Sequence, residues 1–488
     1  MINFRKSINK ILKFDHLYYN INLNKFNNEE KELLKVVCYQ NQQFNFNTHY
    51  TKKLNKNIYF YLLKLKNLFS IKRNVKLLLS IIFILFIPKK KLPNLNTDII
   101  FFISMDPRSQ KDSKPILDNF SKKIILIDKS FKMYERYKKI FKNTKIINIR
   151  EYIQIKDYFF ALIKSFNFLK KILIQKKINI HPSMSLGIYF NFFLRIEIYK
   201  KIIKNIKTDK LFIDRGDGCS SNFFISRFKK YNKNNKVFSY SLNGLALNND
   251  LMFSHYLYSD LDYLFCYGKL DKIFITKLFK RNKFKLLNIP NKIIPVGSVR
   301  NFSYKISKIK KKLNVKKKKF NFLYIKSNPT IYDNLDAKCF EKFCLFVNKN
   351  ISGSQILVKE KLDSISKLNN TLIKKKIINK KNIYSSVNIV PEELFQKTDF
   401  VVGTSSAALA QAIYYDIPLI CLDNKVIISS FLKFFCSIYV EHIDKIEKYK
   451  KKIIYIGNNS SPKNKGKKII FKDVNRNPYL KILDIIKK

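Results

Sequence analysis

The chain of 488 residues is long enough for two or three domains, and its 46% hydrophobic residues can build complete cores. Lysines spread over nearly every segment produce a formal net charge of +61, within the Lys-, Asn-, Ile-, Phe- and Tyr-rich bias of an AT-rich genome. The charge therefore does not by itself indicate a nucleic-acid partner, although such a field attracts phosphates and anionic lipids. Seven cysteines without Cys-x-x-Cys or Cys/His ligand spacing exclude a disulfide framework and a zinc site, and indicate buried thiols in a reducing compartment.

Residues 1–96 contain no glycine, and their pattern predicts a helical, basic extension. The N-terminus lacks the continuous apolar core and small-residue cleavage site of a signal peptide. The apolar run 77–87 spans 11 residues between clusters of basic residues. It is too short for a transmembrane helix, which needs about 20 residues. Two interpretations stay open for it: a buried core element, or an interfacial segment on anionic lipid.

Residues 97–305 alternate short apolar runs with helical stretches. Such repeated strand–loop–helix units predict an α/β domain with a mostly parallel, doubly wound sheet. We expect strands at 98–106 and 122–128, strand-and-loop segments at 210–218, 237–244, 262–268 and 293–301, and helices at 185–206, 220–231 and 269–281.

Residues 306–319 are so rich in lysine that they predict a solvated linker. A second α/β domain follows at 320–470, and an amphipathic C-terminal helix is expected within 471–488. The elements expected in the second domain are strands at 320–329 and 354–362, a helix at 336–349, a surface insertion at 363–382, a helix–strand–turn–helix–strand segment at 390–423, and a polar loop at 456–468.

Glycine is scarce, and its positions are informative. The chain has ten glycines, whereas average usage of about 7% would give roughly 34. Six of the ten lie where an apolar run turns into a loop, which is where open α/β sheets bind their ligands. These turn glycines are Gly216, Gly218, Gly244, Gly268, Gly297 and Gly403.

The segment 390–423 carries the strongest candidate site. Gly403, Thr404, Ser405 and Ser406 form an expected turn between a buried strand and a helix. Hydroxyls and free backbone N–H groups at a helix N-terminus suit a phosphate or diphosphate. The alternative is that a serine only caps the helix, which contributes about 1 kcal/mol. Both roles can hold at once.

This segment resembles the GT-B glycosyltransferases and glycerophosphotransferases of surface polysaccharide synthesis. The resemblance is strongest to the CDP-glycerol glycerophosphotransferase family and related capsule enzymes. Those proteins share an aspartate-initiated strand, a Ser-Ser turn, an alanine-rich helix and an Ile-Pro strand, matched here from Asp399 to Asp423. Further segments resemble family motifs in the same order, so that the resemblance covers about residues 200–425; they are 239–244, 297–301, 321–330 and 356–362.

The resemblance implies two Rossmann-like domains with a ligand cleft between the carboxyl ends of their sheets. It places the diphosphate of a nucleotide-activated donor on the second domain and the acceptor on the first. The donor and phosphate contacts that it implies are Gly403, Thr404, Ser405, Ser406, Gln411, Arg300 and Lys359. Arginine offers a bidentate fork for phosphate, although Arg300 could equally pair with a carboxylate.

Four positions depart from the family pattern. The histidine of the family's Lys-x-His-Pro motif falls near Lys361. Asn243 stands where the family has a turn histidine proposed as general base, and an amide cannot accept a proton at neutral pH. Gln411 stands where many GT-B enzymes have a ribose-binding glutamate. Asp416 stands where they have glycine.

Other acid/base candidates are Asp214 and Asp217 in the D-R-G-D-G segment, and His255. A carboxylate at a strand end could deprotonate an acceptor hydroxyl within hydrogen-bond reach. The alternatives are an ion pair with Arg215, a helix N-cap at Asp217, and a structural role for His255.

The sequence therefore predicts an α/β protein with two Rossmann-like, doubly wound domains and a GT-B-like arrangement. Its expected activity is transfer of a sugar or polyol phosphate from a nucleotide-activated donor to a glycan or lipid-linked glycan acceptor. We expect a cytoplasmic location, with the anionic inner membrane surface as a further partner, and neither a resident cofactor nor a metal nor nucleic acid. A UDP-sugar 2-epimerase-like enzyme and, because of Asn243, a non-catalytic glycan-assembly protein stay open.

Overall fold

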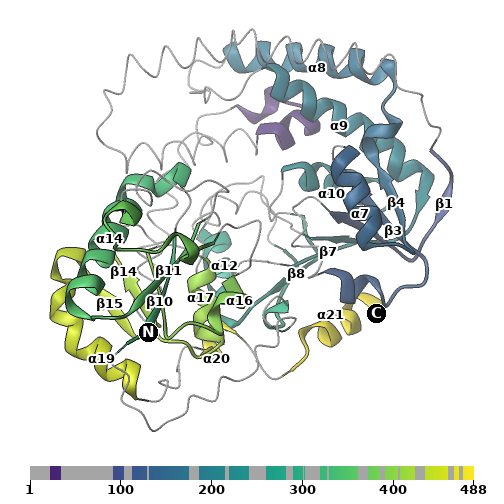
Figure 1. Cartoon of the computed structure of the whole chain (residues 1–488). Helices are drawn as coiled ribbons and strands as arrows, with labels where there is room; N and C mark the ends of the chain where they lie inside the picture. Colours follow the sequence, from purple (N-terminus) through teal and green to yellow (C-terminus); the bar gives the residue numbers. More distant parts are fainter. Residues whose placement is uncertain are drawn as a thin grey trace.

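The computed structural model describes residues 22–34, 92–103, 113–128, 131–174, 186–214, 219–240, 260–281, 290–299, 302, 319–326, 329–360, 372–384, 391–404, 407–423, 433, 435–459, 467–471 and 476–488. These residues build two parallel sheets with helices packed on their faces (Figure 1). The expected α/β class with two doubly wound domains is confirmed.

The first sheet has seven strands in the spatial order β4-β3-β2-β6-β7-β8-β9, and every pair is parallel. Numbered along the chain, this order is 3-2-1-4-5-6-7, the Rossmann order with one strand added. The strands are β2 (Ile99–Ile103), β3 (Lys123–Ile127), β4 (Lys145–Asn148), β6 (Lys210–Ile213), β7 (Lys236–Tyr240), β8 (Tyr263–Cys266) and β9 (Lys292–Pro295). A separate parallel pair joins β1 (Leu95–Asn96) to β5 (Ile206–Lys207).

The second sheet has six parallel strands in the order β12-β11-β10-β13-β14-β15. Along the chain this is 3-2-1-4-5-6, again the Rossmann order. The strands are β10 (Asn321–Ile325), β11 (Gln355–Lys359), β12 (Ile383–Tyr384), β13 (Phe400–Gly403), β14 (Leu419–Leu422) and β15 (Ile438–Val440).

Helices connect these strands. Those expected at 185–206, 220–231, 269–281 and 336–349 are present, whereas the helices at 131–140, 155–174 and 450–458 were not predicted, and the expected polar loop at 456–468 ends in a short helix at 467–470. Those of the first domain are α7 (Phe131–Ile140), α8 (Ile155–Ile174), α9 (Leu186–Asn205), α10 (Cys219–Tyr231) and α12 (Lys269–Arg281). Those that follow are α14 (Pro329–Asn350), α16 (Pro391–Phe395), α17 (Ala407–Tyr414), α19 (Lys450–Asn458), α20 (Lys467–Ile470) and α21 (Pro478–Lys487).

The strands are apolar without interruption because both faces of each sheet are covered. Successive side chains of a strand point to opposite faces. In β2, Phe101 belongs to the core cluster on one face and Phe102 to the cluster on the other, where it stacks on Phe224 of α10 with ring centroids 5.2 Å apart. This double burial explains why the strands could be located from hydrophobic runs alone.

The C-terminal segment joins the two domains. The ring of Phe471 lies between Tyr267 of the first domain, at 5.6 Å, and Tyr414 of the second, at 5.1 Å. A Cβ atom at Gly268 would lie 2.1 Å from the carbonyl oxygen of Ile470, so only glycine allows α20 to approach this closely. One core cluster therefore continues from one domain into the other.

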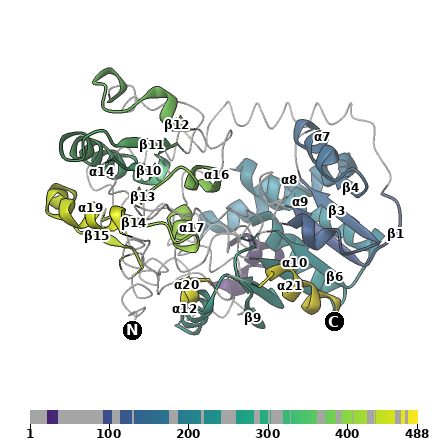
Figure 2. The same ribbon diagram turned by 60° about the horizontal axis from the view of Figure 1, so that its bottom comes forward.

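The expected C-terminal helix is α21, and it returns to the first domain (Figure 2). Asn477 caps its N-terminus by accepting a hydrogen bond from the backbone N–H of Tyr479. The ammonium of Lys481 donates to the carbonyl oxygen of Pro295 at the end of β9, at 3.0 Å. A helix that follows the second domain thus completes the core of the first.

Residues 22–34 pack on the outer helices of the first domain. Asn27 and Glu30 form a reciprocal capping box, in which each side chain accepts from the other's backbone N–H at 3.0 and 2.7 Å. Leu33 and Leu34 are fully buried. The apolar run 77–87 lies outside the described residues, so its expected contact with lipid stays a prediction.

None of the helices that the structure describes is both long and apolar enough to span a bilayer.

Of the surface insertion expected at 363–382, the described residues include 372–382, and this part is not wholly at the surface. Leu372 and Ile378 are buried in the core of the second domain. Lysines stand between these apolar residues in the sequence, which is why the segment suggested a solvated loop.

Five described cysteines are unpaired thiols, and four of them are buried: Cys266, Cys339, Cys344 and Cys421. Burial raises the pKa of the Cys339 thiol to about 12, and the nearby Asp336 and Asp423 carboxylates add to this shift. These four cysteines therefore behave as buried apolar groups, as the sequence predicts.

Candidate functional site

The strand order of each sheet reverses between its first and fourth strands, at β2/β6 and at β10/β13. Ligands of open α/β sheets bind at the carboxyl ends of the strands beside such a reversal. The D-R-G-D-G segment begins directly after β6, and the Gly403–Ser406 turn begins at the end of β13. The two motifs richest in candidate residues therefore occupy equivalent places in the two domains.

Gly403 is required by the packing of its own strand end. A Cβ atom there would lie 2.9 Å from the carbonyl oxygen of Ile325, in the neighbouring β10, and 3.0 Å from the side chain of Leu409. Contacts under 3.0 Å with backbone cannot be relieved by rotating a side chain. The glycine thus lets the end of β10 and the helix α17 close around the turn.

Thr404 faces the interior. Its hydroxyl donates to Oδ1 of Asp336 at 2.7 Å, and the hydroxyl of Tyr324 donates to the same oxygen at 3.2 Å. All three residues are buried. Burial, reinforced by the Asp336 carboxylate, raises the pKa of Tyr324 far above its usual value and keeps it a hydrogen-bond donor. The Thr404 side chain therefore fixes the turn from behind, and only its backbone N–H stays a candidate for phosphate contact.

Gln411 lies on α17, the helix that follows the turn. Its side chain is 6% exposed, and its Oε1 atom has no hydrogen-bond partner among the described residues. Buried side-chain oxygens are nearly always hydrogen-bonded, so one without a partner calls for an explanation such as a bound ligand.

Lysines lie at the carboxyl ends of β10 and β11. Lys359 is 5% exposed, and its carbonyl oxygen accepts from the backbone N–H of Lys326 at 3.1 Å. The ammonium of Lys326 pairs with Glu360 at 3.0 Å and lies 4.5 Å from the ring centroid of Phe340. The sequence reasoning included Lys359 but missed Lys326, although its place directly after the first strand of the sheet was a usable signal.

Asp416 explains one departure from the family pattern. Its φ is 57°, in the left-handed region that glycine adopts without cost and aspartate tolerates. Its carboxylate pairs with Lys467 of α20 at 2.6 Å. The aspartate thus preserves the turn and adds a contact with the C-terminal segment.

In the first domain, Asp214 follows β6 and is 2% exposed. Its backbone N–H donates to the carbonyl oxygen of Phe102 at 3.3 Å, which ties it to the end of β2 at the strand-order reversal. Asp214 is therefore a buried acid at the β2/β6 reversal. Asp128, which follows β3 at the same end of the sheet, pairs with Arg150 and Arg195 at 2.7 Å.

Gly297 lies in a turn that the side chain of Tyr240 holds. The Tyr240 hydroxyl donates to the carbonyl oxygen of Gly297 and accepts from the N–H of Val299, both at 2.9 Å. The φ of Gly297 is 106°, so an L side chain would be strained there. The turn thus lies over the ends of β7 and β9, in the segment that resembles a family motif.

Nine predicted site residues lie outside the described residues, and their roles stay predictions. The expected convergence of the turn glycines on one cleft stays a prediction for the same reason. The nine are Asp217, Asn243, His255, Arg300, Ser405, Ser406, Gly216, Gly218 and Gly244.

Within the described part of the chain, no three His, Cys, Asp or Glu side chains come together as a metal site. At the carboxyl ends of the second sheet, the described groups that suit an anion include the backbone N–H of Thr404 and the lysines at the ends of β10 and β11.

Comparison with known proteins gave similarity to solved structures only; no protein-family model matches the chain, and no curated protein does. UDP-GlcNAc 2-epimerase from Methanocaldococcus jannaschii is 14% identical with a TM-score of 0.49, and the match covers 80% of this chain and 99% of that one. The corresponding epimerase from Rickettsia bellii is 12% identical with a TM-score of 0.48, covering 80% and 96%.

A third structure, the lipopolysaccharide outer core galactosyltransferase WaaB, is 13% identical with a TM-score of 0.43, covering 80% of this chain and 100% of that one. At these sequence identities and TM-scores, the similarity concerns the path of the chain and does not identify an activity.

Proposed function

We propose that this protein is a GT-B-like transferase that moves a sugar or polyol phosphate from a nucleotide-activated donor to a surface-polysaccharide acceptor. The observation that carries the proposal is the turn after β13. It follows the fourth strand of a Rossmann-ordered sheet, its glycine admits close backbone approach, and Asp336 braces it from behind. In this proposal, the backbone N–H groups of residues 404–406 and the hydroxyls of Ser405 and Ser406 bind the donor diphosphate.

The donor's other parts would meet groups beside this turn. Gln411 would hydrogen-bond a ribose hydroxyl, which would satisfy its unpartnered Oε1. Lys359 and Arg300 would neutralise phosphate charge. Negative charge grows on the leaving phosphate in the transition state, and fixed N–H donors and cations aimed there lower the barrier.

The acceptor would bind the first domain at the ends of β6 and β7. Asp214 is our first candidate for the base that deprotonates the acceptor hydroxyl, with Asp217 and His255 as alternatives and Asn243 as a neighbouring polar contact. By resemblance, the acceptor would be a capsule or teichoic-acid-type glycan, free or lipid-linked, and the donor would be of the CDP-glycerol kind. The transferase would then work in the cytoplasm, peripheral to the inner face of the membrane.

A UDP-sugar 2-epimerase-like activity is the second candidate, favoured by the Val296-Gly297 turn before the linker and by the donor site of the second domain. An epimerase needs no acceptor. Incubation with a nucleotide sugar alone, followed by product analysis, therefore separates the two activities: an isomerised nucleotide sugar indicates epimerisation.

The Ser-Ser turn provides the decisive test. Changing Ser405 and Ser406 to alanine removes two hydrogen bonds to a charged group, each contributing about 1.5–3 kcal/mol. Donor affinity, measured by calorimetric titration with CDP-, UDP- and CMP-activated donors, should fall about a hundredfold or more.

A matched control is Ser354→Ala, at the opposite end of the same sheet, where the hydroxyl accepts from the N–H of Phe320 at 2.9 Å. It should lower thermal stability and leave donor affinity unchanged. If the double variant binds donors like the parent and loses only about 1 kcal/mol of stability, the serines are caps and the transferase proposal fails.

A further inference from the structure

The outer face of α8 is apolar and uncovered. Of the ten exposed large hydrophobic side chains in the described residues, five belong to this one helix. They are Phe159 (63% exposed), Phe160 (55%), Ile163 (57%), Phe166 (52%) and Ile174 (61%). Their spacing places them along one side of a helix of 20 residues, about 30 Å long.

The opposite side of α8 is already used in the fold. Tyr158, Phe168 and Ile172 are buried, and Phe168 packs edge-on against Tyr189 of α9 with ring centroids 5.0 Å apart. Figure 1 shows α8 at the outer edge of the first domain with α9 beneath it. The exposed phenylalanines are thus not part of the core that holds the helix in place.

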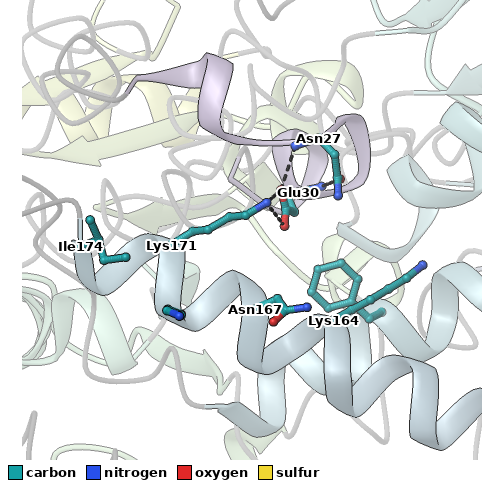
Figure 3. A pocket seen from close by; sticks show the side chains of 8 residues that line it. Asn27, Glu30, Lys164, Asn167, Lys171 and Ile174 are labelled. Carbon is teal, nitrogen blue, oxygen red and sulfur yellow. Dashed lines mark hydrogen bonds and ion pairs between the residues drawn. The ribbon is translucent and has the colours of Figure 1, made fainter.

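Lysines lie on this face and along one side of it. Lys156 and Lys170 are exposed on the same side of α8 as the phenylalanines. Lys164 and Lys171 lie along one flank, where a hollow of about 390 Å³ separates α8 from residues 27–30 (Figure 3). In that hollow Lys171 pairs with Glu30 at 2.8 Å.

We propose that α8 lies in the plane of an anionic phospholipid bilayer, with its phenylalanines and isoleucines at the acyl boundary and its lysines at the headgroup phosphates. Helices with aromatic residues on one side and lysines at the borders bind this region of a membrane. The chain's net charge of +61 indicates which kind of partner would cover the exposed face of α8. A second copy would bring like charges together, whereas an anionic surface attracts lysine-bordered helices. The proposal is independent of the nucleotide-donor proposal, because its tests measure lipid contact and not transfer.

The chain contains no tryptophan, which makes a direct test possible. The variant Phe166→Trp places one fluorophore on the apolar face of α8. Its emission should shift to shorter wavelength on addition of phosphatidylcholine/phosphatidylglycerol vesicles and be quenched by brominated lipid. The matched control is Leu480→Trp, which is 61% exposed on α21 and should show neither effect.

Vesicle flotation measures the contribution of the aromatic side chains. Each phenylalanine that enters the interface should raise the partition coefficient about tenfold, so Phe159→Ser with Phe166→Ser should lower it about a hundredfold. The measurement is made at about 1 M salt, where the Debye length is about 3 Å and non-specific attraction is screened. The control pair Leu345→Ser with Leu480→Ser, also exposed, should bind like the parent.

Three results would overturn the proposal. The first is fluorescence emission of the Phe166→Trp variant that vesicles leave unchanged, or that changes equally in the Leu480→Trp control. The second is emission already shifted without lipid in proportion to protein concentration, which indicates a second copy on α8. The third is emission shifted without lipid at every concentration, which indicates that another part of this chain covers the helix.

Discussion

The two sheets have the same order over six strands, and they differ in the residues found where this order reverses. After β6 the first domain has the buried acid Asp214, whereas β13 of the second ends in Gly403, with backbone N–H groups after it. Strand order therefore fixes where a ligand can bind, and the residue at the strand end fixes what kind of ligand it suits. An acid suits a hydroxyl that must lose a proton, and N–H groups suit a phosphate.

The two domains also differ in how their outer layers are held. Outer helices α8, α9 and α10 of the first domain meet around Glu29, which pairs with Lys164, Lys200 and Arg227. The outer layers of both domains pack on apolar clusters. In the second domain the ion pairs described for α14 are exposed: Lys342 with Asp444, and Lys349 with Glu447. Acid should therefore weaken the first domain before the second.

The largest expected effect concerns the acid at the first reversal. Asp214→Asn removes the proposed base, which should lower kcat by about 10²–10⁴-fold while donor affinity stays unchanged. Steady-state kinetics with donor titration measures both quantities. Asp209→Asn, at the exposed amino end of the same strand, is the control and should leave kcat unchanged. An unchanged kcat in Asp214→Asn would move the role of base to another residue.

The next largest effect concerns Asp336, which accepts hydrogen bonds behind the turn that follows β13. Asp336→Ala leaves the hydroxyls of Thr404 and Tyr324 buried without this acceptor. Each such loss costs about 1–3 kcal/mol, and the Tyr324 bond is long at 3.2 Å, so we expect unfolding free energy to fall by about 2–4 kcal/mol.

Denaturant unfolding of Asp336→Ala and of Asp336→Asn, which keeps a carbonyl acceptor, measures this effect. The asparagine variant should lose clearly less stability. Equal losses in the two variants would show that the hydrogen bonds to this oxygen do not support the turn.

The smallest expected effect is on the pH dependence of stability, and it concerns Glu29 between the outer helices of the first domain. Burial favours the neutral form of Glu29, but hydrogen bonds from Lys164 and Lys200 and the charge of Arg227 outweigh it and lower the pKa from 4.5 to about 2. A lowered folded-state pKa contributes stability above pH 4.5, and this stability is lost as pH falls from 4.5 towards 2. The shift corresponds to at most about 3 kcal/mol, and because water reaches the lysines we expect about 1–2 kcal/mol.

Glu29→Gln should therefore be less stable than the parent at neutral pH, with a difference that vanishes near pH 2. Chemical unfolding at several pH values measures it. The control is Glu135→Gln, which breaks an exposed pair with Lys138 at 3.1 Å and should leave stability almost unchanged at every pH, because water screens the pair. A Glu29→Gln deficit that persists unchanged at low pH would exclude the ion pairs as its cause.

The sequence by itself determined the local elements and the fold class. Strands such as β2 and β10 are buried on both faces, so they appear as unbroken apolar runs, and the glycines mark the loops that follow them. The order of those runs along the chain predicted two doubly wound domains. Open α/β sheets bind ligands at the carboxyl ends of their strands. The segments that follow the strands were therefore the place where candidate site motifs could be found from the sequence.

Only the tertiary structure decided which side chains meet. Nothing in the sequence relates Thr404 to Asp336, 68 positions apart, or assigns α21 to the first domain. The same holds for α8, a helix that was not predicted from the sequence and whose phenylalanines stay exposed. The local sequence pattern shows how apolar one face of a helix is. What covers that face depends on contacts between distant segments, which only the folded chain supplies.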